Sequence, residues 1–177
     1  MIAATLPTPR RWAALLAGVC VAALAFAFLL QYGFDLAPCP LCVWQRYPFG
    51  IAAGLGLLAA FGPRPRLWLG LAVATLLVGA GLSAYHVGIE QGIFALPETC
   101  AAEAAPASIE DLRAQLSAAP VRCDRVAASF LGLSLPAWSG LAALGLAVLT
   151  AVALLRQGSV APRAGAWFHS ALRLASC

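Results

Sequence analysis

Four long apolar stretches, separated by shorter polar segments, dominate the pattern of residues along the chain. They predict transmembrane helices at about 12–30, 43–62, 67–88 and 135–155. At a rise of about 1.5 Å per residue, stretches of about 20 residues cross a hydrocarbon core of about 30 Å. Backbone polar groups at that depth must pair within their own segment, and no alternating barrel pattern is present. The sequence therefore predicts an all-α membrane protein, a four-transmembrane-helix bundle forming a single integral-membrane domain over residues 1–177.

The first apolar stretch has a second interpretation as a signal peptide. Arg10 and Arg11 precede it, and Ala25-Phe26-Ala27 offers a small-residue cleavage site. However, the stretch is longer than the usual apolar region of about 7–15 residues, and three further spans follow it. We therefore expect an uncut helix.

Composition and charge give the bundle an orientation. Only 10% of the residues are charged and 62% are hydrophobic, which excludes an ordinary soluble globule. The net charge of +4 is scattered, without the basic stripe that nucleic acid requires. Because the cytoplasmic side carries the excess of basic residues, both termini and the tail at 156–177 are predicted to be cytoplasmic. That side holds no acid and these arginines: Arg10, Arg11, Arg64, Arg66, Arg156, Arg163 and Arg173.

The predicted topology leaves two loops on the side opposite the cytoplasm, at about 31–42 and 89–134. In the second loop Ser108 precedes Glu110 and Asp111, while Ile109, Leu112 and Leu116 have helical spacing. This pattern predicts a short amphipathic helix. It either lies on the membrane surface or is a solvated loop helix, and the sequence leaves both open.

The cysteines separate into two outer pairs and two isolated residues. Cys39 and Cys42 lie in the first loop, and Cys100 and Cys123 lie in the second. An oxidising compartment favours disulfides between such residues. Cys20 falls inside the first span and Cys177 ends the tail, so neither is expected to take part in chemistry with the other four.

Cys39 and Cys42 form a C-x-x-C motif at the entrance of the second span, and Arg46 follows one helical turn later. A thiol at a helix N-terminus has its thiolate favoured, which suits it to disulfide exchange. A permanently charged guanidinium beside an apolar span is costly without a partner. The partner is either the Cys42 thiolate or a polarised oxygen of a bound molecule. Alternatively, Arg46 extends to lipid headgroups.

Cys100 and Cys123 allow three interpretations. They could form a purely structural disulfide, or they could exchange with the first pair. All four cysteines could instead hold one zinc ion. Because the second pair lacks the close spacing of zinc ribbons, we expect no metal site.

These motifs resemble the bacterial disulfide bond formation family DsbB. The resemblance rests on Cys39-Pro-Leu-Cys42-Val-Trp-Gln45-Arg46, on Cys100 and Cys123, and on Phe130-Leu-Gly-Leu-Ser-Leu-Pro136-Ala-Trp138. It covers about residues 10–157. It implies an inner-membrane thiol oxidase that reoxidises a soluble thioredoxin-like partner, DsbA, and delivers electrons to a membrane quinone, either ubiquinone or menaquinone.

The resemblance also implies roles for individual residues. Cys100 would form the mixed disulfide with the partner, Cys123 would be its pairing cysteine, and electrons would then pass to Cys39 and Cys42. Cys42 would face the quinone ring, and Arg46 would stabilise the Cys42 thiolate and charge on the quinone oxygen. His86 is a second candidate for quinone binding, or else a polar residue at the membrane interface.

Two other functions are compatible with the motifs. One is a four-helix membrane scaffold with two structural disulfides that binds a partner protein. The other is an enzyme similar to vitamin K epoxide reductase. In such an enzyme the C-x-x-C that meets the quinone belongs late in the chain, so its early position at residues 39–42 favours the first function.

Overall fold

The computed structural model describes residues 8–97, 100, 108–110, 113 and 122–159. Its long helices are α1 (Pro9–Gly33), α3 (Arg46–Phe61), α4 (Pro65–Glu90) and α7 (Leu135–Ser159), and the short helix α2 (Pro40–Trp44) precedes α3. Within these residues the only sheet is the hairpin of β1 (Ser129–Phe130) and β2 (Leu133–Ser134). The predominantly helical chain confirms the all-α class, whereas the bundle of four transmembrane helices stays a prediction.

Three helices, α1, α4 and α7, are long and apolar enough to cross a membrane, and each contains one of the predicted spans. The span predicted at 43–62 is instead divided between α2 and α3. Pro48 explains the break, because a proline has no N–H to donate to the carbonyl of Trp44, four residues earlier. Gln45, at the junction, keeps helical dihedral angles (φ −66°, ψ −18°), so α2 leads directly into α3.

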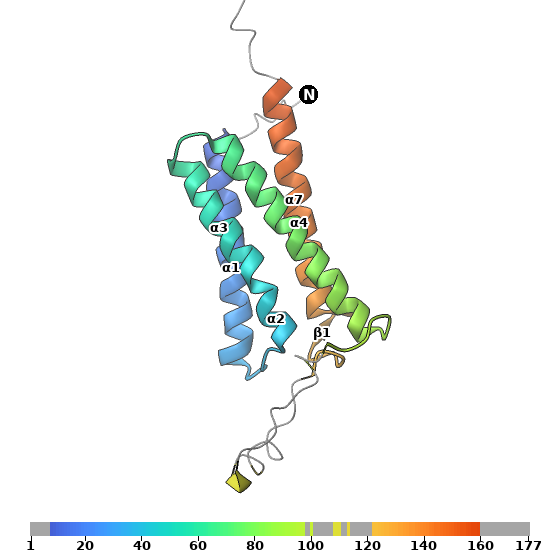
Figure 1. Cartoon of the computed structure of the whole chain (residues 1–177). Helices are drawn as coiled ribbons and strands as arrows, with labels where there is room; N and C mark the ends of the chain where they lie inside the picture. Colours follow the sequence, from blue (N-terminus) through green and yellow to red (C-terminus); the bar gives the residue numbers. More distant parts are fainter. Residues whose placement is uncertain (1–7, 98–99, 101–107, 111–112, 114–121, 160–177) are drawn as a thin grey trace, which may run out of the picture.

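The helices are arranged in the order α1, α3, α4, α7 around the bundle, and α1 meets α7 at few points. In Figure 1 the start of α1, the connection between α3 and α4 and the end of α7 lie at one end of the bundle. Helix α2, the end of α4 and the β hairpin lie at the opposite end. The two cysteine-containing segments therefore come to the same end.

Small residues let the helices approach closely. A Cβ atom added at Gly56 would lie 3.0 Å from the Cβ of Ala17 on α1, and one added at Gly79 would lie 2.9 Å from the Cβ of Pro48. Close contact of this kind is typical of helix packing in lipid, where apolar side chains gain nothing by leaving the solvent. Cys20 lies fully buried in this core, as expected of a small apolar residue.

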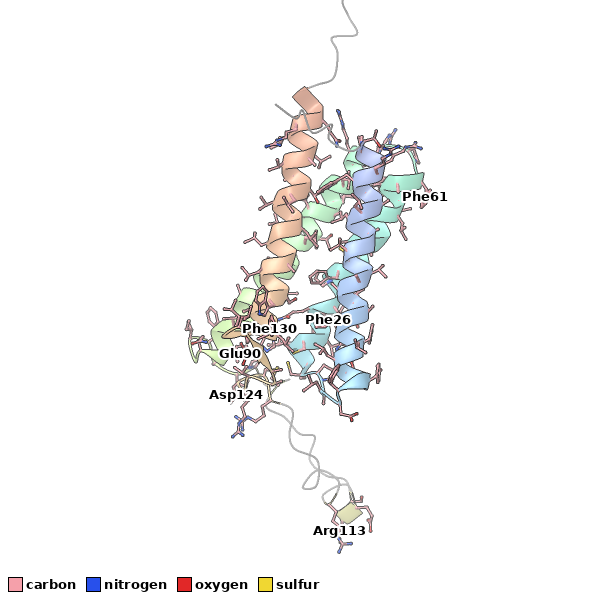
Figure 2. All side chains as sticks on the ribbon, turned by 180° about the vertical axis from the view of Figure 1, so that it is seen from behind. Phe26, Phe61, Glu90, Arg113, Asp124 and Phe130 are labelled. Carbon is pink, nitrogen blue, oxygen red and sulfur yellow. A yellow bond between two sulfur atoms is a disulfide. The ribbon has the colours of Figure 1, made fainter. Side chains whose placement is uncertain are left out.

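Large apolar side chains cover the outside of the bundle. Phe26, Phe61, Val78 and Leu155 are all exposed, and Figure 2 shows Phe61 projecting outward at the end of α3. Such a surface is stable when hydrocarbon surrounds it and unstable in water. Together with the apolar helices, it identifies the chain as a multi-pass membrane protein.

The second loop contains a hairpin that the sequence analysis did not predict. Leu131 and Gly132, between its strands, have positive φ angles of 51° and 79°, the geometry of a tight two-residue hairpin turn. The indole of Trp138 donates a hydrogen bond to the carbonyl of Phe130 (2.9 Å), which ties the hairpin to α7. Of the predicted amphipathic helix, Ile109, Glu110 and Arg113 are helical, and the rest lies outside the described residues.

Candidate redox site

Cys39 and Cys42 occupy the first turn of α2. Cys39 is the N-cap residue and Pro40 is the first helical residue, where its missing N–H costs nothing. The cap brings the backbone N–H of Cys42 to 3.2 Å from the Cys39 sulfur, and the two Sγ atoms lie 2.9 Å apart. Both residues are present as thiols. The predicted C-x-x-C thus forms a compact dithiol at the end of the bundle.

His86, on α4, lies beside this dithiol. Its Nε2 atom is 3.6 Å from the Cys39 sulfur, and its Nδ1 atom is 2.9 Å from the side-chain nitrogen of Gln45. His86 and Gln45 are buried, with 1% and 6% of their surfaces exposed. When the Gln45 amide donates to Nδ1, the proton of the neutral imidazole resides on Nε2 and points at the sulfur. The two side chains thereby form a hydrogen-bonded chain that ends on Cys39.

These contacts lower the pKa of the Cys39 thiol well below its ordinary value. The main cause is the hydrogen bond with the Cys42 thiol, and the hydrogen bonds from His86 and from the backbone of Cys42 add to it. Burial of Cys39 acts in the opposite direction. Cys39 is therefore well suited to carry a thiolate. Stabilisation of a Cys42 thiolate by Arg46 stays a prediction.

Cys100 and Cys123 form a disulfide, with Cα atoms 5.8 Å apart. Both residues are buried, and they pack in one apolar cluster with Cys39, Ile89 and the partly buried Leu41, Cys42 and Leu96. All four predicted cysteines thus meet in one cluster. Their catalytic roles remain predictions.

A cavity of about 460 Å³ separates α1 from α7 next to Cys42. Its walls are almost entirely apolar and come from α1, the α2–α3 segment, α7 and the hairpin. Cys42 is the only one of the four cysteines that lines it. Phe26 on α1 and Phe130 on β1 both line it, and both are labelled in Figure 2. The size is that of a site for a small organic molecule.

Arg46 is the charged residue of this cavity. Its guanidinium donates a hydrogen bond to Oε1 of Gln31 (2.7 Å) and lies 4.9 Å from the centre of the Phe28 ring. These contacts come from α1, and they hold the cation at the cavity wall. Whether Arg46 serves a bound molecule or lipid headgroups stays a prediction. His86, in contrast, lies outside the lining of this cavity.

His86 lines a second, much smaller cavity of about 40 Å³. Cys39, Cys42 and Glu90 line it too, together with Arg122 and Arg125. Ser134 donates a hydrogen bond to Glu90 (2.6 Å), and Arg122 forms an ion pair with Asp124 (2.9 Å). Cys42 therefore faces both cavities, whereas Cys39 and His86 face only the smaller one.

Gln31, Phe28 and Gln45 contribute to the site without having been predicted as functional residues. Gln31 and Gln45 are amides next to apolar spans, and such polar groups need partners when buried. This need for a partner marks Gln31 and Gln45 as candidate functional residues. It does not identify the partners, because Gln45 and His86 are 41 residues apart in the chain.

Taken together, the fold and the site define a multi-pass membrane protein with two cysteine pairs in one cluster, one of them beside an apolar cavity. The model of the family "Disulfide bond formation protein DsbB" matches residues 9–153. The chain belongs to this family. Family membership makes the protein a disulfide oxidoreductase that acts in disulfide bond formation.

Similar proteins carry the same description. The chain is 34% identical to disulfide bond formation protein B of Saccharophagus degradans, over 86% of this chain and 96% of the relative. It is 34% identical to the protein of that name from Acidovorax sp. strain JS42, over 87% and 92%. For the Hahella chejuensis protein of that name the identity is also 34%, over 76% and 86%. No solved structure gives a significant match.

Proposed function

We propose that the protein is a thiol oxidase of the bacterial inner membrane that reoxidises a periplasmic thioredoxin-like partner similar to DsbA and reduces a membrane quinone. The observation that carries this proposal is the placement of Cys42. It lies in the same cluster as the Cys100–Cys123 disulfide and also lines the apolar cavity. The chain thus offers a continuous route for disulfide exchange from its second loop to the lipid-soluble acceptor.

The cavity fits a quinone by its chemistry. Its apolar walls suit a ring that partitions into lipid, and Arg46 is a fixed donor for a ring oxygen that gains negative charge. Gln31 and the Phe28 ring orient the guanidinium, so little conformational freedom is lost when it meets a ligand. A bound quinone supplies the capacity to accept two electrons and two protons.

The cysteines perform the exchange steps. A partner thiolate attacks Cys100, which breaks the Cys100–Cys123 bond and leaves Cys123 as the thiolate. A second partner thiolate then releases Cys100, so the partner leaves oxidised and the loop pair is a dithiol. This dithiol reduces the Cys39–Cys42 disulfide in the same way, by attack of a thiolate on a sulfur. The reduced first pair then gives up two electrons and two protons at the cavity and becomes a disulfide again.

Turnover of purified protein tests the proposal. The sample receives a reduced thioredoxin-like protein and a short-chain quinone, and the fall in quinone absorbance is followed. We expect Cys42→Ser to reduce the rate at least about 1,000-fold, because it removes a group that reacts covalently. The matched control is Cys20→Ala, a cysteine buried in the core away from the cluster, and it should turn over normally. Equal rates for Cys42→Ser and the control would exclude the mechanism.

The proposed topology has four spans and both termini in the cytoplasm. Helix α3 alone is about 24 Å long, whereas the continuous segment Pro40–Phe61 reaches about 33 Å at 1.5 Å per residue, which matches the hydrocarbon core. All seven acidic residues would then lie on the periplasmic side.

Labelling of cells tests this topology. After mild reduction, a membrane-impermeant maleimide should modify Cys100 and leave Cys177 unmodified until the membrane is permeabilised. Modification of Cys177 in intact cells would place the tail outside and reverse the orientation.

A further inference from the structure

Three groups that ligate soft metal ions converge at the smaller cavity. The sulfurs of Cys39 and Cys42 and a ring nitrogen of His86 all lie within 4.8 Å of one another. Zinc binds sulfur at about 2.3 Å and nitrogen at about 2.0–2.1 Å, so the ligand atoms of a tetrahedral site lie roughly 3.5–3.8 Å apart. The separation of Cys39 Sγ and His86 Nε2, 3.6 Å, already has that value. The two sulfurs, at 2.9 Å, need to separate by about 0.9 Å to reach the tetrahedral spacing of about 3.8 Å.

Gln45 supplies the outer support that a metal-binding histidine needs. Its side-chain amide lies at Nδ1 of His86 and has both a donor and an acceptor. The amide nitrogen lies there in this structure, and rotation of the amide would bring its oxygen to the same place. The oxygen then accepts the Nδ1 proton, and the lone pair of Nε2 points to the sulfurs. Metal-ligating histidines almost always have such an outer hydrogen bond, which fixes the ring and its tautomer.

The size and charge of the smaller cavity decide which kind of ligand it can bind. A volume of about 40 Å³ accommodates one ion with a water molecule and excludes an organic ligand. Once the metal displaces both thiol protons, the two thiolates and the Glu90 carboxylate give the lining three negative charges. A water is available as fourth ligand. Of the two arginines in the lining, Arg122 is already paired with Asp124, which leaves the charge of Arg125. The balance favours a divalent cation.

We propose that the reduced Cys39–Cys42 pair and His86 form a binding site for a thiophilic divalent cation of the zinc class, which holds the enzyme in its reduced state. Binding replaces the two thiol protons by the metal and releases them, and no electrons move. The disulfide form has no thiolates and cannot bind. Because the coordinated sulfurs are unavailable for oxidation, the cation competes with the quinone. This inhibitory consequence rests on the proposed function, whereas the binding itself does not.

Titration of the reduced protein with Cd²⁺ tests the site, because cadmium–thiolate bonds absorb in the ultraviolet. The other four cysteines are first replaced by alanine, so that only Cys39 and Cys42 remain. We expect one Cd²⁺ per chain, displaced by Zn²⁺, and no signal in the oxidised protein. Gln45→Leu should weaken binding about 10- to 100-fold, the usual cost of losing an outer partner, and His86→Gln should weaken it at least as much.

Ser83→Ala is the matched control, because Ser83 is buried on α4 one turn from His86. It should bind Cd²⁺ as the parent does. Parental affinity in both Gln45→Leu and His86→Gln would show that the dithiol binds alone and would overturn the proposal. Circular dichroism and the thermal midpoint identify a variant that fails to fold, and the other variant then decides the question.

Activity of the full-length chain tests the inhibition separately. Zn²⁺ should lower the rate of quinone reduction, and a chelator should restore it. Turnover that persists with the site occupied would overturn the inhibition. If the metal-free parent does not turn over at all while Cd²⁺ still binds, the proposed function fails and the binding site stands.

Discussion

The two cysteine pairs share one apolar cluster but are built in different ways. Cys39 and Cys42 are neighbours on one turn of α2, with a helix cap and a histidine beside them. Cys100 and Cys123 are 23 residues apart and meet because the two ends of a loop pack against the end of α4. Local geometry fixes the first pair to the bundle and to the cavity, whereas the second depends on the loop. This difference agrees with the function that we propose, in which the first pair faces the acceptor and the second faces the partner.

The largest effect on the rate of quinone reduction is expected when one cysteine pair is removed and the other is kept. In the double variant Cys100→Ala and Cys123→Ala, quinone reduction driven by the thioredoxin-like partner should fall at least about 100-fold, because the first receiver of electrons is lost. Reduction driven by a small dithiol, which needs only the first pair, should change less than about threefold. Stopped-flow absorbance of the quinone measures both rates.

The double variant Cys39→Ala and Cys42→Ala is the matched comparison, and it should lose both activities. If both double variants lose the reaction with the small dithiol, the two pairs are not separable in the way that we infer.

An intermediate effect is expected from replacing Arg46, the cation that lines the larger cavity. Arg46→Met keeps the length of the side chain and removes a charge-assisted hydrogen bond worth about 1.5–3 kcal/mol, which raises the apparent KM for quinone about 10- to 100-fold. The KM for the partner protein should stay the same, because the proposed mechanism has the partner meet the second pair. Steady-state kinetics with each substrate varied in turn checks both values. Arg64→Met, at the opposite end of the bundle, is the control, and an equal effect there would argue against a specific role for Arg46.

The smallest effect concerns one of the contacts between the second loop and the bundle, the hydrogen bond from Ser134 to Glu90. Ser134→Ala removes the hydrogen bond to Glu90 and should lower the free energy of unfolding by about 1 kcal/mol. Differential scanning calorimetry in detergent should then show a lower midpoint. Ser129→Ala, an exposed serine of the same hairpin, should leave the midpoint where it is. A loss of the same size in both variants would trace the effect to the hairpin rather than to the bond with Glu90.

Much of the fold could be predicted from the sequence. Three of the four apolar stretches are long helices at the expected places, because segment length and hydropathy act locally and need no knowledge of neighbours. The division of the second stretch was readable from Pro48, whose effect on a helix is equally local. The hairpin at 129–134 was missed, since strands of two residues carry no periodicity to detect.

Only part of the candidate site could be predicted from the sequence. The C-x-x-C and the arginine one turn later follow from spacing along one segment. His86 was grouped with Arg46 as a residue for quinone binding, yet the two side chains line different cavities. Spacing could not separate them, because the rotation of α4 relative to α3 is decided by contacts between helices.

The sequence by itself therefore determined the class of protein, the helical segments, the charge asymmetry and the cysteine pair that sits on one turn. These follow from interactions within about one helix length. The tertiary structure alone decided that Cys42 faces an apolar cavity, that His86 lies between Cys39 and Gln45, and that the Cys100–Cys123 disulfide packs against the first pair. The physical reason is close packing of small residues: Gly79 admits Pro48 against α4, and that contact sets the register in which Gln45 reaches His86.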